Sequence, residues 1–260
     1  MHVLLIGDIV GRAGRRAVKE NIPELIKQFE IDFIIANGEN AAGGNGLTQE
    51  VANELFAAGI NVLTMGNHVW DQKEIFNFID KESRIVRPAN YPAGAPGTGI
   101  NIFKNKHGES IGVMNLSGRI FMPGNLDCPF HKVDEILTKI KNRVKALVVD
   151  FHAEATSEKI AFGLYLDGRV SAVCGTHTHV QTADEKILPG GTAYISDIGM
   201  TGPAESVIGV KAGLVIEKFL TQLPRRFEVA PGLYQFNAVV IEINAQTGES
   251  GSIVRIANNE

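Results

Sequence analysis

Five polar segments each follow a short apolar run, and four of the chain's seven histidines lie in these segments. They are Gly7-Asp8, Asn37-Gly38-Glu39-Asn40, Gly66-Asn67-His68, Asp150-Phe151-His152 and Gly175-Thr176-His177-Thr178-His179. Carboxylate, amide and imidazole groups are metal ligands, and a histidine can also donate a proton near neutral pH. The set therefore predicts a metal site.

Each residue has an ordinary structural explanation when it is taken alone. An Asp or Asn after a strand is usually a turn residue, and a single strand-end histidine is usually just hydrogen-bonded. His177 and His179 are more specific, because two imidazoles two residues apart in an extended segment can approach one metal or two. The metal prediction therefore depends on the whole set, and the three other histidines keep the ordinary explanation.

The apolar runs indicate which elements position these residues. Runs at 3–6, 33–36, 62–65, 146–149 and 170–173 predict buried strands. Apolar residues recur at helical spacing between them, at 18–29, 51–56, 75–79 and 133–140. Such alternation is typical of βαβ units around a largely parallel sheet, whose ligand site lies beyond the carboxyl ends of the strands. The five polar segments should therefore meet in one crevice.

Two regions depart from this alternation. Residues 100–116 and residues 234–256 each predict a β-hairpin, so antiparallel strands should flank the parallel ones. A helix is expected near 209–222, and the long loops are expected at 88–99 and 118–129.

Bulk properties limit the function classes. A chain of 260 residues is long enough for one α/β domain, expected over 1–260, and a net charge of -4 argues against a broad basic face for nucleic acid. Two cysteines, Cys128 and Cys174, are too few for a disulfide framework and favour a cytoplasmic protein with free thiols. The apolar run at 2–6 is too short for a signal peptide, and no run approaches a membrane span, so we expect no membrane association.

The order of the polar motifs resembles the calcineurin-like metallophosphoesterase superfamily. Gly-Asp-Ile-Val-Gly-Arg at 7–12, Asn-Gly-Glu-Asn at 37–40 and Gly-Thr-His-Thr-His at 175–179 look like its bacterial YmdB-like branch. The matching motifs span residues 7–179. The resemblance implies a four-layer αββα sandwich with mixed sheets and helices on both outer faces. It also implies a phosphodiesterase that acts on small phosphodiesters, notably 2′,3′-cyclic nucleotides.

The resemblance also implies a division of the ligands between two metals. Asp8 and His179 would hold the first metal, Glu39 would bridge both, and the second would be held by Asn67, His152 and His177. The chain departs from the usual pattern at Val10, where a histidine is common, and at Glu39, where an aspartate is common. Asn40 would supply the ligand that the missing histidine would have given, so the first metal is the less defined of the two.

Two metals about 3.5–4 Å apart can share a hydroxide and hold a phosphate for in-line attack. Two divalent ions, less the charges of Asp8, Glu39 and a hydroxide, leave about +1 for an anionic substrate. Nitrogen and oxygen ligands without a thiolate fit two divalent or mixed-valence ions of iron or manganese, with zinc as the alternative.

His68 follows the expected ligand Asn67, and the resemblance makes it the general acid for the leaving oxygen, kept protonated by an acid such as Asp71. The alternative is that His68 is a further metal ligand. Arg12 and Arg119 are candidate substrate contacts, and for both the alternative is an ordinary solvated side chain.

Other function classes stay open at this point. A phosphomonoesterase or nucleotidase is the nearest alternative, and a non-catalytic metal-binding regulatory protein is another, although a purely structural site would not need His68. A dinucleotide-binding oxidoreductase is disfavoured, because the glycines at 7, 11 and 14 lack the G-x-G-x-x-G spacing. The expected partner is a small phosphodiester and not a stably bound nucleic acid, and a homo-oligomer is possible.

Overall fold

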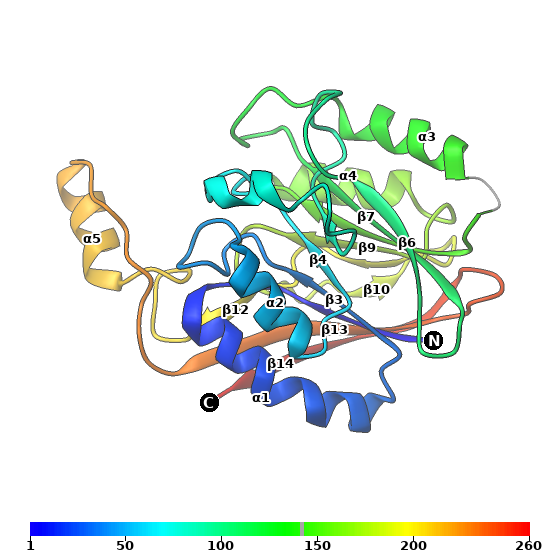
Figure 1. Ribbon diagram of the computed structural model, residues 1–260, viewed down its shortest axis with the longest axis horizontal. Helices are drawn as coiled ribbons and strands as arrows, with labels where there is room; N and C mark the ends of the chain where they lie inside the picture. The colour runs from blue at the N-terminus through cyan, green and yellow to red at the C-terminus, as the bar shows by residue number, and fades with distance from the viewer. Residues whose placement is uncertain (141–142) are drawn as a thin grey trace.

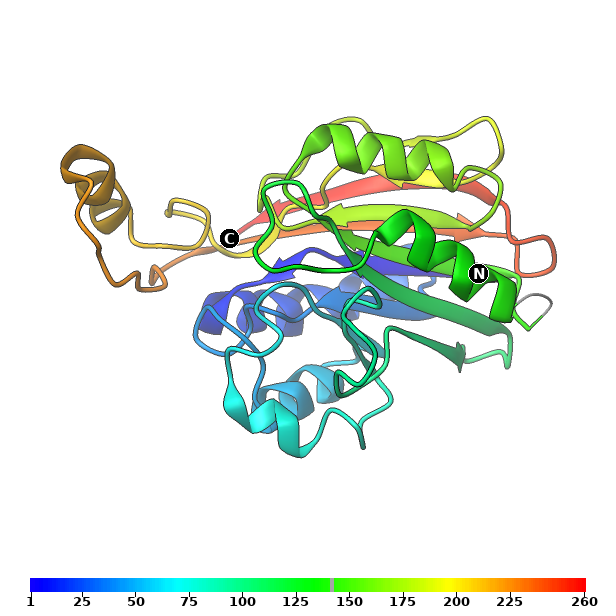
Figure 2. The same ribbon diagram turned by 90° about the horizontal axis from the view of Figure 1, so that it is seen from above.

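The computed structural model describes residues 1–140 and 143–260. Two mixed sheets pack face to face, with α1 and α2 on the outside of the first sheet and α3 and α4 on the outside of the second (Figures 1 and 2). The expected four-layer αββα sandwich is therefore confirmed.

The first sheet, within the described residues, has eight strands in the order β2-β12-β13-β1-β3-β4-β5, with β14 paired to β13. Their bounds are β1 His2–Ile6, β2 Asp8–Ile9, β3 Phe33–Asn37, β4 Val62–Thr64, β5 Ile85–Val86, β12 Met200–Pro203, β13 Tyr234–Ile243 and β14 Ser250–Asn259. Strands β1, β3 and β4 run parallel, whereas β13 runs antiparallel to β1.

The second sheet has six strands in the order β10-β11-β9-β8-β7-β6, counted over the same described ranges. Their bounds are β6 Ile100–Lys104, β7 Ser110–Ser117, β8 Ala146–His152, β9 Ala172–Thr176, β10 Lys186–Ile187 and β11 Ala193–Ile195. Strands β7, β8, β9 and β11 run parallel, so their carboxyl ends lie at one edge.

The helices are α1 Gly11–Phe29, α2 Gln49–Ala57, α3 Pro129–Ile140, α4 Thr156–Tyr165 and α5 Ala212–Thr221, with a 3₁₀ helix η1 at Lys73–Asn77. Four of the α-helices pack on the sheets, but α5 lies on a segment that projects away from them (Figure 1). No helix in the described part of the chain is both long and apolar enough to cross a membrane.

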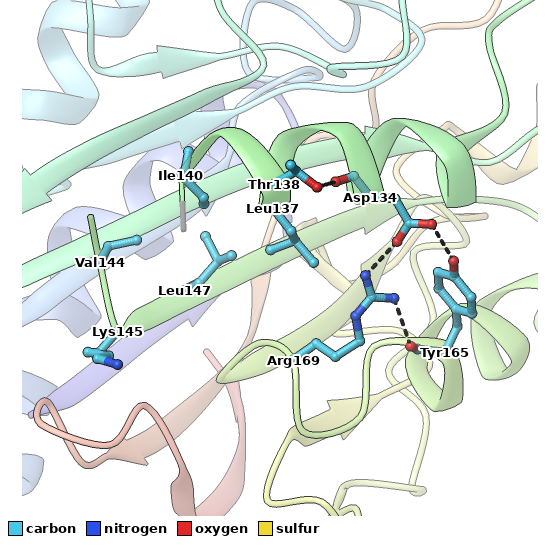
Figure 3. Close-up of a pocket in the computed structure, with 9 residues that line it drawn as sticks. All are labelled: Asp134, Leu137, Thr138, Ile140, Val144, Lys145, Leu147, Tyr165 and Arg169. Carbon is cyan, nitrogen blue, oxygen red and sulfur yellow. Dashed lines mark hydrogen bonds and ion pairs between the residues drawn. The ribbon is translucent and has the colours of Figure 1, made fainter. Parts of the chain in front are cut away.

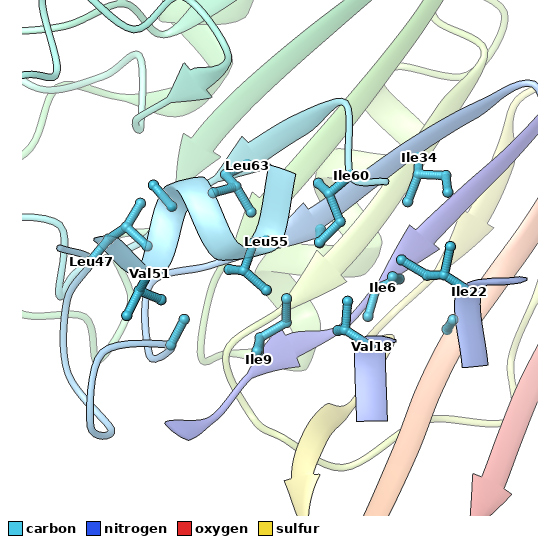
Figure 4. Close-up of a cluster of buried hydrophobic side chains, with 14 of the residues drawn as sticks. Ile6, Ile9, Val18, Ile22, Ile34, Leu47, Val51, Leu55, Ile60 and Leu63 are labelled. Atoms are coloured by element: carbon cyan, nitrogen blue, oxygen red, sulfur yellow. The ribbon is translucent and has the colours of Figure 1, made fainter. Parts of the chain in front are cut away.

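Three apolar clusters fill the spaces between the layers. Figure 4 shows the first cluster, where Val18 and Ile22 of α1 and Leu55 of α2 lie against the first sheet. The second lies between the two sheets and includes Phe33 and Val148. The third lies between the second sheet and helices α3 and α4. Alternate residues of each inner strand therefore face two different apolar layers, which is why these strands are apolar throughout.

Most predicted elements are confirmed, with three differences. Both hairpins form, and the predicted helix near 209–222 is α5. The helical pattern at 75–79 forms only the 3₁₀ helix η1, and the strand expected at 170–173 lies at 172–176. The five polar segments lie at the ends of strands that belong to two facing sheets, whereas the alternation of apolar runs and helical patterns predicted a single open sheet. Helix α4 and the short strands were not predicted.

Phe151 of β8 is completely buried and stacks on Phe162 at a centroid distance of 4.1 Å. Phe151→Ala should therefore lower the free energy of unfolding by about 3–5 kcal/mol in urea denaturation. Phe121 is 86% exposed, so Phe121→Ala is the matched control and should change stability by less than about 0.5 kcal/mol. Equal losses in the two variants would contradict this assignment of the third apolar layer.

Candidate metal centre

The structure brings the five polar segments together at one edge of the sandwich. The first sheet contributes the residues after β1, β3 and β4, and the second sheet those at the ends of β8 and β9. The residues placed there are Asp8, Glu39, Asn40, Asn67, His68, His152, His177 and His179. Parallel strands deliver their carboxyl ends to the same side, which explains why residues far apart in sequence meet.

His152 lies at the centre of the cluster. Its Nε2 is 3.0 Å from Oδ1 of Asn67, 3.1 Å from Oε1 of Glu39 and 3.1 Å from Nδ1 of His177. His152 and Glu39 are buried. Atoms with lone pairs crowd together in the protein interior only when a proton or a cation lies among them. Glu39, His152 and His177 therefore form a candidate cation site, with Asn67 at its side.

Each of the three histidines uses its other ring nitrogen on a partner outside the cluster. These outward pairs are His152 Nδ1 with Thr176 Oγ1 at 2.9 Å, His177 Nε2 with Glu154 Oε2 at 3.1 Å, and His179 Nδ1 with the Ile208 carbonyl at 2.9 Å. Carboxylate and carbonyl oxygens only accept, so the outward nitrogens of His177 and His179 carry the protons. The Thr176 hydroxyl donates its own proton to Asp150, so it accepts from Nδ1 of His152. The inward nitrogens then present lone pairs, which is the arrangement of metal-binding histidines.

Asp8 contributes an unsatisfied oxygen. Its Oδ2 accepts from the backbone N–H of His177 at 3.2 Å, but its Oδ1 is buried and has no hydrogen-bond partner among the described residues. That oxygen is 3.8 Å from Nε2 of His179 and 3.9 Å from Nδ1 of His152. A buried carboxylate oxygen without a partner is unfavourable, and a bound cation would satisfy it. The donor set thus fits a metal.

Asn40 lies beside the same residues, but its amide nitrogen faces them. Its Nδ2 is 3.2 Å from Oε1 of Glu39 and 3.3 Å from Nε2 of His179. A ligand role for Asn40 therefore requires a half-turn of the amide, which brings the oxygen inward. This role stays a prediction.

The buried carboxylate of Asp150 accepts hydrogen bonds from residues next to the cluster. Asp150 accepts hydrogen bonds from Thr176 Oγ1 at 2.7 Å, from Asn37 Nδ2 at 3.1 Å and from the hydroxyl of Thr64. Because the Thr176 proton points to Asp150, the Thr176 oxygen must accept from Nδ1 of His152. The chain Asp150–Thr176–His152 thus sets the tautomer of the central histidine. We had not predicted this role, although Asp150 lies in one of the polar segments.

A second buried pair holds the turn that carries His177 and His179. Lys159 Nζ is 2.6 Å from Oδ2 of Asp197, which also accepts from the backbone N–H of Thr178 at 3.0 Å and from its hydroxyl at 2.8 Å. Both histidines have a positive φ, 104° and 66°, which is uncommon for residues other than glycine. The ion pair offsets the strain of this turn. Lys159 and Asp197 are distant in sequence, and no motif identified them.

The electrostatics favour positive charge at the cluster. Burial lowers the pKa of His177 to about 3, so His177 is neutral, the form that binds a metal. Burial also raises the pKa of Asp8 to about 6. Burial alone would raise the pKa of Glu39, but the charge of His152 outweighs it and lowers the pKa to about 2. For His152, burial lowers the pKa but Glu39 and Asp8 outweigh it, which gives a value of about 9. A divalent cation would replace that proton.

His68 lies beside the cluster and is oriented differently. Its Nδ1 is 2.7 Å from Oδ2 of Asp71, and its backbone N–H donates to Oε2 of Glu39 at 2.9 Å. The side chain of His68 is 34% exposed and lines a cavity of about 830 Å³. The Asp71 contact is the one expected for a proton donor.

The cavity opens above the cluster. One side of it is formed by Glu39, Asn40, His68, His177 and His179, and the other side by residues of the segment 207–229. Arg12 and Arg119 are exposed and do not line the cavity, so their substrate contacts stay predictions. Lys218 and Arg226 do line it, and neither was singled out from the sequence.

A separate hollow of about 630 Å³ lies over the second sheet, between α3, the end of α4 and Arg169 (Figure 3). Asp134 pairs there with Arg169 at 2.5 Å and with the hydroxyl of Tyr165 at 2.5 Å. None of the predicted site residues lines this hollow. Its polar groups satisfy one another, so it is not a candidate active site.

The chain is similar to proteins of a described family and to solved structures. The model of the family described as "YmdB-like protein" matches residues 4–256. A Bacillus subtilis protein named 2′,3′-cyclic-nucleotide 2′-phosphodiesterase is 52% identical over 260 residues, which is 100% of this chain and 98% of the relative. A solved structure from Mycoplasma pneumoniae, titled a novel phosphatase, has a TM-score of 0.94 at 35% identity and covers 100% of this chain and 93% of that one. A hypothetical protein from Thermus thermophilus has a TM-score of 0.93 at 42% identity, with both chains fully covered.

Thr176→Val should weaken metal binding about 10- to 100-fold, because it removes the acceptor that sets the His152 tautomer. Thr176→Ser keeps the hydroxyl and is the matched control. Calorimetric titration of the chelator-treated proteins with Mn²⁺ measures both, with circular dichroism to establish that each variant is folded. A folded Thr176→Val variant with unchanged affinity would show that Thr176 does not orient His152.

Proposed function

The chain belongs to the YmdB-like family, and on that premise we propose that it is a metal-dependent phosphodiesterase of small phosphodiesters, with 2′,3′-cyclic nucleotides as the substrate class. The observation that carries this proposal is that three histidines with inward lone pairs surround Glu39 and the buried Asp8 oxygen that has no partner among the described residues. Glu39, His177 and His179 of this set line the open cavity. We further propose that residues 1–260 act as one catalytic domain. The name of the Bacillus subtilis relative supports the substrate class.

The ligand cluster suits two metals. Asp8 and His179 would hold one of them, joined by Asn40 after its amide turns, and the other would be held by Asn67, His152 and His177. Two divalent ions would polarise the phosphate and lower the pKa of water enough for attack near neutral pH. The nitrogen and oxygen ligands fit iron or manganese, with zinc as the alternative.

Glu39 is suited to lie between the two metal positions. Its Oε1 faces His152 and its Oε2 accepts from the backbone of His68, so the two oxygens point in different directions. The lowered pKa of about 2, set by His152 against the effect of burial, keeps the carboxylate ionised. An aspartate has the same two oxygens on a shorter side chain.

His68 would protonate the leaving oxygen. Asp71 accepts from Nδ1 and so orients the ring, which leaves Nε2 to donate a proton to the leaving oxygen. When water attacks phosphorus, a new P–O bond forms, one P–O bond to the ribose breaks, and the proton of His68 moves to that ribose oxygen. The proton that the attacking water loses restores the protonated His68. The product is a nucleoside 2′- or 3′-monophosphate in which the released ribose oxygen is a hydroxyl.

The other functions make different demands on the site. A structural metal site is closed, whereas this cluster lines a cavity, which disfavours a non-catalytic metal-binding regulator. A phosphomonoesterase remains the second candidate, because Lys218 and Arg226 add positive charge that a monoester dianion would also use.

His68→Ala should retain both metals and lower kcat on 2′,3′-cyclic AMP by about 10²- to 10⁴-fold, because the leaving ribose alkoxide needs a proton. The same variant should lose far less activity on bis(p-nitrophenyl) phosphate, whose leaving group departs as a stable anion. Metal content by mass spectrometry and steady-state kinetics measure these effects. Loss of metal in His68→Ala would make His68 a ligand.

The wild-type protein, loaded with Mn²⁺, should hydrolyse 2′,3′-cyclic nucleotides with a higher kcat/KM than linear diesters or p-nitrophenyl phosphate. Liquid chromatography of the products measures this preference. Turnover of linear diesters alone would overturn the substrate class, and preference for the monoester would favour the phosphomonoesterase. Failure on every ester with metal bound would overturn the enzyme assignment.

A further inference from the structure

The cavity above the metal cluster has a second wall. It belongs to residues 204–233, which we call the arm, between the end of β12 and the start of β13. The arm projects from the body and carries α5 (Figures 1 and 2). At its base, Val210 pairs with Val229, and the backbone N–H of Ala230 donates to the carbonyl of Gly209 at 2.9 Å. These contacts hold the two chain segments of the arm together.

The base of the arm is also tied to the proposed metal ligands. The carbonyl of Ile208 accepts from Nδ1 of His179 at 2.9 Å. Ile208 has a φ of 46°, a strained value for a β-branched residue, at the position whose carbonyl accepts this hydrogen bond. The wall that the arm forms therefore has a defined position relative to the metal cluster.

The side chains that the arm presents to the cavity are mainly apolar. Phe219 is 70% exposed, Ile208 52% and Phe227 43%, and Val210 and Val229 lie beside them. Large exposed aromatic side chains in a cavity are typical of ligand sites, where the ligand covers them. The opposite end of the same cavity holds the polar cluster, so the cavity combines an apolar end with a phosphate-binding end.

The size and charge of the cavity fit a nucleotide better than a phosphate alone. Its volume of about 830 Å³ lies within the usual range for organic ligands. Lys218 and Arg226 lie in the lining, and Nζ of Lys218 is 4.8 Å from the ring centroid of Phe227. An aromatic wall with cations beside it is the combination on which nucleobases stack.

We propose that the arm forms a nucleobase subsite, in which the base of the cyclic nucleotide packs on Phe219 and Phe227 while its phosphate lies at the metal cluster. The inference rests on the proposed function. Stacking accepts any base, so this subsite selects nucleotides over phosphodiesters that lack a base and does not select one base strongly.

The test compares 2′,3′-cyclic AMP with glycerol 1,2-cyclic phosphate, which has the same five-membered cyclic diester but no base. The wild-type kcat/KM should be about 5- to 150-fold higher for the nucleotide. Phe219→Ala and Phe227→Ala should each lower this ratio, mainly by raising KM for the nucleotide, and the rate on the glycerol ester should not change. Phe227→Tyr should keep the ratio.

Leu220 provides the matched control. It follows Phe219 on α5 and is 81% exposed, but it does not line the cavity. Leu220→Ala should therefore leave the ratio unchanged. Light scattering of each variant tests the competing occupant, a second copy of the chain on the arm. A changed oligomeric state in Phe219→Ala with equal losses on both substrates would overturn the subsite.

The two proposals fail in different ways. A wild-type ratio near one would overturn the nucleobase subsite and leave the phosphodiesterase assignment intact. If neither ester were hydrolysed, that assignment would fail, and binding would still test the subsite. Adenosine 3′-monophosphate should then bind the Mn²⁺-loaded protein more tightly than glycerol phosphate, and Phe227→Ala should abolish the difference. Equal binding of the two ligands would overturn the subsite.

Discussion

The carboxylate of Asp150 joins the two sheets directly beneath the metal-ligand cluster. Asp150 belongs to β8 of the second sheet, and it accepts from Asn37 of β3 and Thr64 of β4, both in the first sheet, as well as from Thr176 of β9. Burial raises the pKa of Asp150, so its charge is tolerated only while these donors surround it. The ends of strands β3, β4, β8 and β9 must therefore lie next to one another. The proposed ligands that follow these strands are brought together for the same reason. Glu39 lies two residues after Asn37, and His152 two residues after Asp150.

The site divides into a rigid part and a lightly packed part. The proposed metal ligands lie at the ends of strands that are buried between apolar layers, where a displacement would disturb close packing. The arm has far less support, because Val215 is the one buried residue of α5. The proposed metal site thus lies on the core, whereas the proposed nucleobase subsite lies on a segment with few buried residues.

The sequence predicted the elements that depend on local pattern and missed those that depend on distant partners. Apolar runs identified the inner strands because these are buried on both faces, and the strand ends identified the site. Nothing in the local sequence shows that Lys159 pairs with Asp197, or that Asp150 hydrogen-bonds across the sheets, since each contact joins strands and loops far apart. At 75–79, the apolar spacing correctly marked buried residues, but the backbone turns more tightly than an α-helix.

Val10 connects the metal cluster to the arm. In the metallophosphoesterase pattern that the sequence resembles, a histidine is common at position 10. In this chain the Val10 side chain packs against Gly202 and Gly209. A Cβ added to Gly202 would lie 2.9 Å from Val10, and one added to Gly209 would lie 3.0 Å from it. Gly209 belongs to the base of the arm and has a φ of 100°. At this position the chain therefore has an apolar contact with the base of the arm. The proposed first metal is left with fewer protein ligands, and one of them, His179, takes its orientation from Ile208 of the arm. The placement of the arm and the orientation of the His179 ring are therefore coupled.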